Sequence, residues 1–293
     1  VLVKTTPLAI CGIAVALSFK MKIWNIGAEG QFYLGALATA AVVRYAYMDS
    51  FAVMLILMVS ASAAAGGLWG GFAGYLRARW NVNEIITTLM LNYVAIHLVE
   101  YFIYGPWRDP ASLGFPMTAP FPEAARLPVF GNSRVHIGIL TALVLVLLYR
   151  VVLRWTRWGF EIRAIGENPK AAEYAGIPFL KNAVFVMAVS GALAAIAGMG
   201  EIAGLQGRLQ AGLSPGYGYT AIIVAWLARL NPWGILVVAF FMGGLFVGGE
   251  SLQVVMRLPL STIQVIQGFI LFFVLASEFF RVYRVRIISS EAD

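Results

Sequence analysis

The stretch FAVMLILMVSASAAAGGLWGGFAGYL, residues 51–76, carries no charged side chain from its first residue to its last. A membrane core of ~30 Å is crossed by ~20 apolar residues in a helix, so this stretch is long enough to span it. Within it, Gly66, Gly70 and Gly74 recur at every fourth position and therefore lie on one helix face. Small residues on one face predict close packing against a second helix in the membrane.

The composition of the whole chain also indicates an integral membrane protein. Of the 293 residues, 60% are hydrophobic and only 12% are charged, and the mean hydropathy is +0.81. Soluble domains carry about 25% charged residues. The net charge of +7 comes from short basic clusters between apolar runs. Because these clusters form no continuous basic stripe, we expect contact with membrane lipid and no nucleic-acid partner.

Nine apolar segments divide the chain, and they predict an all-α, polytopic helical membrane protein with a single transmembrane domain over residues 1–293. The first segment begins directly at Val1, so we expect one more segment upstream. The nine are residues 1–19, 28–47, 51–76, 85–104, 135–153, 182–205, 209–229, 232–253 and 259–280.

The basic residues predict the orientation of these segments. If the polar stretch 154–181 is cytoplasmic, fourteen Lys and Arg lie on the cytoplasmic side and seven on the other. Cytoplasmic loops carry the excess of basic residues, so we expect this orientation, with a cytoplasmic C-terminus. The loop 105–134, rich in proline and aromatic residues, is then external and is expected to form an ordered cover that contacts an external partner. The junction at residues 25–31 falls at the cytoplasmic end.

Two features of the later segments each allow two interpretations. Residues 60–74 and 190–204 share six identical positions, which indicates either an inverted repeat or the chance matching of Ala- and Gly-rich runs. The seventh segment is interrupted by QGRLQAGLSPGYGY, residues 206–219. This interruption indicates either a break that lines a pathway or an external loop before a short helix.

The motif NIGAEGQ, residues 25–31, joins the first two segments and contains Asn25, Glu29 and Gln31. Its glycines leave the backbone bendable, so we expect a helix to begin here with free N–H groups beside the Glu29 carboxylate or a ligand oxygen. These three residues are predicted to line a substrate pathway. The alternative is an ion pair of Glu29 with Lys20 or Lys22 that fixes a turn at the cytoplasmic surface.

The fourth segment carries a second set of polar residues. Glu84, Thr88 and Asn92 follow one another at intervals of four, with Thr87 adjacent, so one helix face is polar. In lipid such a face must turn to the protein interior or to water. We expect these four residues to line the same pathway, and the alternative is hydrogen bonding between helices.

The polar stretch RWTRWGFEIRAIGENPKAAEYAGIPFLK, residues 154–181, predicts a short surface helix. Asn168 can cap it, Pro169 suits its first turn and Gly176 can adopt the left-handed conformation that ends it. Small residues along it would let it enter a groove of a partner protein. An ordinary cytoplasmic loop is the alternative.

Three motifs carry a resemblance to a known family. NIGAEGQ and NVNEIITTLMLNYVA, residues 81–95, resemble signatures of the nucleoside branch of bacterial ABC importer permeases. RAIGENPKAAEYAGI, residues 163–177, resembles the loop by which permeases of the wider group, for ribose, branched-chain amino acids and nucleosides, touch their ATPase. The resemblance implies that this loop, about 154–181, couples to the ATPase through Arg163, Gly166, Asn168, Pro169, Ala171, Ala172, Ala175 and Gly176.

The resemblance also implies a function and partners. We expect a multi-pass permease subunit of the bacterial inner membrane that moves nucleosides inward by alternating access. Its partners would be a second permease subunit in a heterodimer, an ATPase that binds ATP and Mg²⁺, and an external solute-binding lipoprotein. A flat base would need stacking aromatic residues, for which Trp24, Tyr93 and Tyr217 are candidates. A ribose-type sugar is the alternative cargo, and a stand-alone secondary transporter or channel is the alternative class.

The sequence lacks the motifs for ATP hydrolysis, for a catalytic triad and for a metal site. It contains no GxxxxGK[ST] phosphate loop, so this chain is not expected to hydrolyse ATP. It also lacks a catalytic triad, and we expect no catalytic residue. His97 and Glu100 lie one turn apart, but His136 is distant in the sequence and Cys11 is the only cysteine, so we expect no metal site and no cofactor in this chain.

Overall fold

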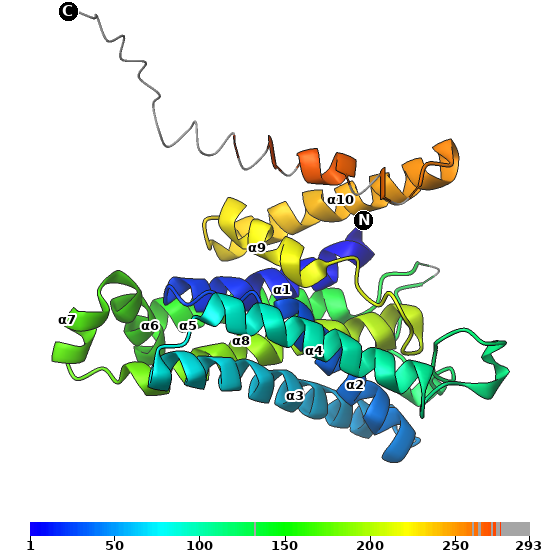
Figure 1. Ribbon diagram of the computed structural model, residues 1–293, viewed down its shortest axis with the longest axis horizontal. Coiled ribbons are helices and arrows are strands. Elements are labelled where there is room, and N and C mark those ends of the chain that lie inside the picture. The colour runs from blue at the N-terminus through cyan, green and yellow to red at the C-terminus, as the bar shows by residue number, and fades with distance from the viewer. Residues whose placement is uncertain (132, 260, 263–264, 271, 274–275, 277–293) are drawn as a thin grey trace, which may run out of the picture. The chain divides into compact units, whose positions relative to one another are not determined.

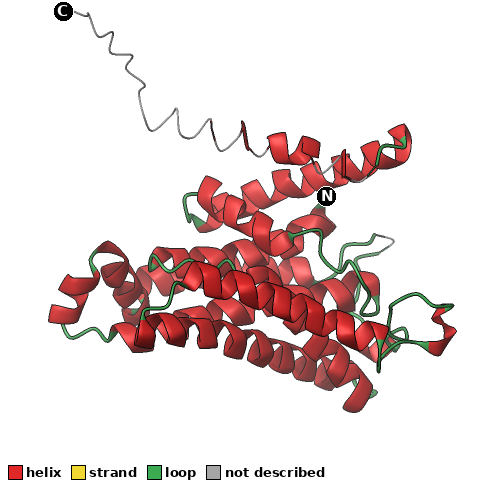
Figure 2. Cartoon of the chain, in the orientation of Figure 1, coloured by secondary structure: helices red, strands yellow, loops and turns green. Residues whose placement is uncertain are grey.

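The computed structural model describes residues 1–131, 133–259, 261–262, 265–270, 272–273 and 276 (Figure 1). Within these residues the chain forms helices joined by loops and contains no β-strand (Figure 2), which confirms the predicted all-α class. The α-helices are α1 Leu2–Lys20, α2 Ala28–Tyr45, α3 Phe51–Trp80, α4 Glu84–Tyr104, α5 Gly138–Trp155, α6 Arg157–Glu167, α7 Pro169–Tyr174, α8 Phe179–Glu201, α9 Tyr217–Leu227 and α10 Pro232–Met256.

The chain divides into two compact units, Val1–Gly243 and Gly244–Asp293. The first contains α1 to α9 and the first half of α10. Its long helices lie side by side, with α6 and α7 at one end and the loop between α4 and α5 at the other (Figure 1). In the second unit, the described part holds the rest of α10 and short helical turns after it.

Six helices of the described chain are long and apolar enough to cross a membrane, so the protein is a polytopic helical membrane protein. The predicted number of nine segments is not confirmed. Residues 28–47 become α2, which is not among the six, and residues 209–229 keep only the short helix α9. The ninth predicted segment, residues 259–280, lies in part outside the described residues.

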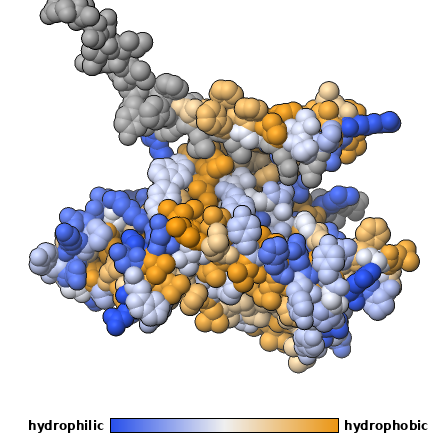
Figure 3. Space-filling model, viewed as in Figure 1, coloured by the Kyte–Doolittle hydropathy of each residue, from blue (hydrophilic) through white to orange (hydrophobic). Residues whose placement is uncertain are grey.

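Helix α1 forms the centre of Val1–Gly243. Every residue from Thr5 to Phe19 is buried, and the helix packs against α8, α9 and α5. A helix that is apolar all round suits a fully buried position. By contrast, α3, α4 and α5 expose apolar side chains such as Leu68 on α3, which is 77% exposed. Figure 3 shows hydrophobic side chains over the helices and hydrophilic ones toward both ends of the helices, including the end that carries α6 and α7.

Helices α3 and α8 pack through small residues. A β-carbon at Gly66, Gly70 or Gly74 would collide with the backbone or side chains of α8, at Gly191, Met187 and Ala183. The predicted small-residue face is therefore confirmed, since only glycine leaves room for such close backbones. The residue numbers rise along α3 as they fall along α8, so the two helices are antiparallel. This direction agrees with an inverted repeat, which itself stays a prediction.

Two glycines of α8 allow a matched test of this packing. A β-carbon at Gly198 would collide with the carbonyl oxygen of Phe32 on α2, whereas one at Gly200 would lie 3.9 Å from the nearest atom, in His136. We expect Gly198→Ala to lower stability by about 1–3 kcal/mol or more, because two backbones would have to separate. Gly200→Ala should be neutral or stabilising, since alanine favours a helix over glycine. Melting temperatures of the purified variants in detergent check this, and equal values would contradict the packing.

Part of the loop between α4 and α5 packs on the segment that precedes α9. Its backbone N–H groups at Thr118, Phe121 and Leu127 donate to the carbonyl oxygens of Leu209, Gly207 and Ala203, at 2.9, 2.7 and 2.8 Å. These three carbonyls belong to the segment between α8 and α9. The loop therefore covers the break that precedes α9.

Candidate functional site

The chain reverses direction directly after α1. Lys22 adopts the left-handed conformation with φ +58°, and the N–H groups of Lys22 and Ile23 bond back to the carbonyl oxygens of Phe19 and Ser18. The following residues then run back among the helices, where Asn25 reaches Ser190, eleven residues into α8. At a rise of ~1.5 Å per residue, that is ~16 Å from the start of α8. The predicted position of the NIGAEGQ junction at the cytoplasmic end is therefore wrong, and the junction lies inside the helical body.

Asn25, Gln31 and Ser190 form a buried hydrogen-bond network. The Asn25 amide donates to Gln31 Oε1 at 3.0 Å and to Ser190 Oγ at 2.8 Å, and its oxygen accepts from Gln31 Nε2 and from the Gly27 N–H. Ser190 in turn donates to the carbonyl oxygen of Ala14 in α1 at 2.6 Å. The polar capacity of Asn25 is used inside the subunit, so its geometry favours a role in positioning the junction over contact with a solute.

Glu29 joins the starts of two helices. It lies in the first turn of α2, is 2% exposed, and accepts the backbone N–H of Gly218 in the first turn of α9 at 2.6 Å. The positive ends of two helix dipoles thus meet at one carboxylate, which stabilises its charge. The predicted helix start beside Glu29 is confirmed. The alternative ion pair with Lys20 or Lys22 is wrong, since no bond joins them and the carboxylate is buried.

The close approach of α9 to α2 depends on Gly218. A β-carbon at this position would collide with the backbone nitrogen and Cα of Glu29. Ser214, just before α9, also hydrogen-bonds the Glu29 carboxylate, and it accepts the N–H groups of Gly216 and Tyr217. The interruption before α9 therefore delivers a helix N-terminus into the protein interior.

Asn92 on α4 holds the same junction from the other side. Its oxygen accepts the Gly30 N–H at 2.8 Å, and its nitrogen donates to the carbonyl of Ile26 at 2.9 Å and to the Tyr219 hydroxyl at 3.3 Å. Thr88 lies one turn earlier, buried against Gly27. Asn92 thus bonds to other elements of its own subunit, as expected for the alternative in which this face hydrogen-bonds between helices, whereas the Thr88 hydroxyl bonds within α4.

Two further predicted residues lie at the start of α4. Glu84 pairs with Arg77 at the end of α3, at 3.2 Å, and accepts the Trp24 N–H at 3.4 Å. Thr87 is half-buried, and its hydroxyl donates to the carbonyl oxygen of Asn83 in its own helix. The structure therefore brings together Asn25, Glu29, Gln31, Thr88 and Asn92, with Glu84 at their edge beside Trp24, and leaves Thr87 outside the group. A pathway role for these residues stays a prediction.

Aromatic side chains surround this region. Trp24 stacks on Trp226 of α9, with ring centroids 5.6 Å apart, and Phe19 packs beside both. Trp226 is 51% exposed and Tyr93 of α4 is 52% exposed, so both present open faces. Tyr217 is fully buried against Phe32, so its predicted availability for stacking is wrong. Ser190, Gly218, Tyr219 and Trp226 also belong to this region but were not predicted, although the predicted break at residues 206–219 contains Gly218 and Tyr219.

The predicted short helix at the centre of the polar stretch is confirmed as α7. The Asn168 side chain accepts the N–H groups of Lys170 and Ala171, both at 3.1 Å, Pro169 is the first helical residue, and Gly176 takes φ +77° after it. Ala171, Ala175 and Gly176 are exposed, and Tyr174 is 94% exposed. This helix therefore exposes small residues at its surface.

Three residues of the predicted coupling set face their own subunit or another pocket. Ala172 is 3% exposed, so its side chain does not enter a groove of a partner. Gly166 of α6 packs so closely on the carbonyl oxygen of Lys20 that a β-carbon would collide with it. Arg163 lines a separate pocket beside Lys20. These positions shape the end of the helical body on which α7 sits.

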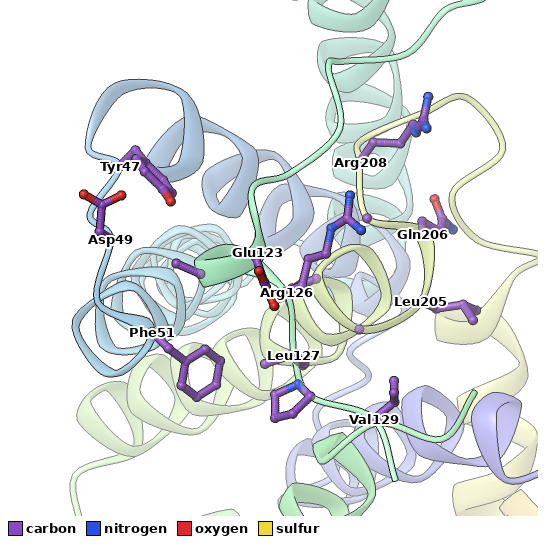
Figure 4. A pocket seen from close by; sticks show the side chains of 15 residues that line it. Tyr47, Asp49, Phe51, Glu123, Arg126, Leu127, Val129, Leu205, Gln206 and Arg208 are labelled. Atoms are coloured by element: carbon purple, nitrogen blue, oxygen red, sulfur yellow. The ribbon is translucent and has the colours of Figure 1, made fainter. Parts of the chain in front are cut away.

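A cleft of about 980 Å³ opens at the opposite end of Val1–Gly243. Its walls come from the α2–α3 turn, the loop between α4 and α5, and residues 203–208. Figure 4 shows Asp49, Glu123, Arg126 and Arg208 around it, so it offers both charge signs. Arg126 is held by a bond from its Nε to the Phe121 carbonyl at 2.8 Å. The cleft can receive polar groups of a solute or a partner protein.

Comparisons with known proteins identify the family. The family profile described as branched-chain amino acid transport system/permease component matches residues 1–275. A glucose ABC transporter permease of Haloferax volcanii is 41% identical over 98% of this chain and 78% of its own length. A guanosine ABC transporter permease of Bacillus subtilis is 35% identical over 93% and 79%, and a nucleoside ABC transporter permease of Lactococcus lactis subsp. cremoris is 28% identical over 92% and 76%.

No solved structure matches the chain. The family profile covers most of the sequence, and the relatives are permease subunits, which are not enzymes themselves. Membership also implies an ATPase and a substrate-binding protein as partners. The chain belongs to the family of multi-pass permease subunits of ABC transporters that carry sugars or nucleosides.

Proposed function

We propose that this permease imports nucleosides by alternating access. The observation that carries the proposal is the convergence of two helix starts, α2 and α9, on Glu29 inside the helical body. Transporters hold polar solutes at such interrupted helices, because unpaired N–H groups and positive helix ends face a cavity at membrane depth. The junction bonded to Asn92 and Gly218 would be the fixed element of the pathway.

The pathway would run over the face where α4 and α9 meet. Asn92 and Tyr219 touch across the two helices, and Tyr93 and Trp226 are exposed on the same two elements. A second permease subunit, in a heterodimer, would close this face and complete the cavity. Asn25, Gln31 and Thr88 would hold the junction in place, and Glu84 would fix the end of α4 near Trp24.

Energy would come from the partner ATPase, which would bind ATP and Mg²⁺ and contact α7 and its neighbours. An external solute-binding lipoprotein would deliver the cargo to the end that carries the 980 Å³ cleft. In this arrangement the protein lies in the bacterial inner membrane, with α7 and the C-terminus in the cytoplasm. The excess of basic residues on the α7 side supports that orientation.

Nucleosides are the cargo that the aromatic faces favour. A base is flat and stacks on exposed rings such as Tyr93 and Trp226, each such contact being worth about 0.5–1.5 kcal/mol beyond burial. Two relatives are named for guanosine and for nucleosides. The second candidate is glucose, because the glucose permease of Haloferax volcanii is 41% identical.

Uptake competition separates the two cargoes. Cells that express the assembled transporter should take up radiolabelled guanosine, and excess unlabelled nucleosides should compete while glucose should not. Cells that lack this chain serve as the control. Saturable glucose uptake that guanosine fails to reduce would replace nucleosides by glucose as the cargo.

A further inference from the structure

Basic side chains gather in a pocket at the end of the helical body that carries α6. The pocket has a volume of about 380 Å³ and lies between the end of α1, the last turns of α5, α6 and the α9–α10 turn. Among its lining residues are Lys20, Arg150, Arg154, Arg163 and Arg229, and no carboxylate lines it. Within the described part of the chain, no ion pair joins Lys20, Arg150, Arg154 or Arg163 to an acidic residue. Because several basic side chains line one concave site, the site is expected to attract an anion.

Hydrogen bonds within the subunit hold the residues that line the pocket in place. Tyr149 is buried, and its hydroxyl donates to the carbonyl oxygen of Leu230 at 3.2 Å, which ties α5 to the α9–α10 turn. Arg229 and Leu230 both adopt the left-handed conformation, with φ +52° and +56°, a strained arrangement for residues with side chains. Asn231 then caps α10 by accepting the Trp233 N–H at 3.0 Å. The site is therefore preorganised by contacts within the subunit.

The surroundings place this pocket at the level of lipid headgroups. Trp155 and Trp233, next to the pocket in sequence, are 74% and 45% exposed, and tryptophan gathers at the membrane–water boundary. Leu143, Leu147 and Val151 precede the pocket on α5, are exposed, and recur at every fourth position, so they lie on one face of that helix. A ligand held here would thus have its anion among the arginines and apolar chains along α5.

We propose that this pocket binds the headgroup of an anionic phospholipid, with its acyl chains lying along α5. Basic pockets between membrane helices recognise the phosphate groups of lipids. No residue of the Glu29 junction or of α7 lines the pocket, so the binding is a property separate from cargo transport.

The test measures phosphatidylglycerol bound to the assembled transporter, by native mass spectrometry and by titration in detergent. We expect Arg150→Gln with Arg154→Gln to weaken phosphatidylglycerol binding by roughly tenfold or more, since two of the attracting charges are removed. Arg150→Lys with Arg154→Lys keeps the charges and should retain most of the binding. Arg79→Gln with Lys181→Gln removes two exposed charges outside the pocket and should leave the binding unchanged.

Four outcomes would overturn the proposal. Equal binding to the glutamine pair would remove the arginines from the site, and equal binding of phosphatidylcholine would remove the need for an anionic headgroup. Displacement by glycerol phosphate or inorganic phosphate at the lipid's own concentration would make the pocket a site for free anions. Absence of bound phosphatidylglycerol from the assembled, wild-type transporter would indicate that the ATPase covers the pocket.

Discussion

Replacing Ala171 by glutamate is expected to reduce uptake by roughly a hundredfold or more while the chain inserts in the membrane normally. Ala171 is exposed on α7, and if α7 enters a groove of the ATPase, the new carboxylate would be buried there without a partner. Such burial costs a few kcal/mol, and ~2.8 kcal/mol corresponds to a hundredfold loss. Uptake and co-purification of the ATPase should fall together.

The position of Ala171 makes this change specific for the contact. Asn168 is the N-cap and accepts the Ala171 N–H, so Ala171 is the third residue of the helix. Glutamate at that position favours the helix, because it can bond back to the cap and it faces the positive helix end. The loss of uptake would therefore not come from a melted α7. Ala171→Ser, which adds no charge, should keep near-normal uptake, and normal uptake by the glutamate variant would remove α7 from the coupling contact.

Some features of α7 could be predicted from the sequence and others could not. Asn168, Pro169 and Gly176 predicted its start, first turn and end, because capping and left-handed stops are local properties. The side chain of Ala172 could not be assigned, since Ala171 and Ala172 are both small and a helix of 6 residues has no periodic pattern. Only the packing on the subunit buries one and exposes the other.

The NIGAEGQ junction illustrates a different limit. Its glycines and Glu29 predicted a helix start beside a carboxylate, and α2 begins there. Hydropathy alone could not reveal that the chain turns back at Lys22, because a reversal of the backbone leaves the apolar count unchanged. The partner of Glu29 was also beyond local patterns, since Gly218 lies 189 positions away in the sequence. For the same reason Ser190 and Tyr219 were absent from the predicted set, although both bond to residues within it.

Glu29→Gln is expected to lower the turnover or the apparent affinity of uptake between ten- and roughly a hundredfold, with normal expression. The substitution keeps the shape of the side chain but removes the charge at which the N-termini of α2 and α9 meet. Hydrogen bonds to a charged acceptor contribute about 1.5–3 kcal/mol, and a neutral amide would turn one N–H₂ group toward helix ends that already present donors. The packing of α9 against α2 would then loosen at the place where the proposed pathway needs the two helices held together.

A charge removed from an exposed pair is the matched control for this variant. His97 and Glu100 pair at 2.8 Å on α4, with side chains 72% and 44% exposed, and such surface pairs contribute ~0–1 kcal/mol. Glu100→Gln should therefore change uptake less than about fivefold, because the lost interaction is screened by water. Uptake kinetics and melting temperatures of both variants are measured together. If Glu29→Gln transports like the wild type, the carboxylate only stabilises the junction, and the pathway must be formed by other residues; if it melts as the wild type does but transports slowly, the charge itself acts in transport.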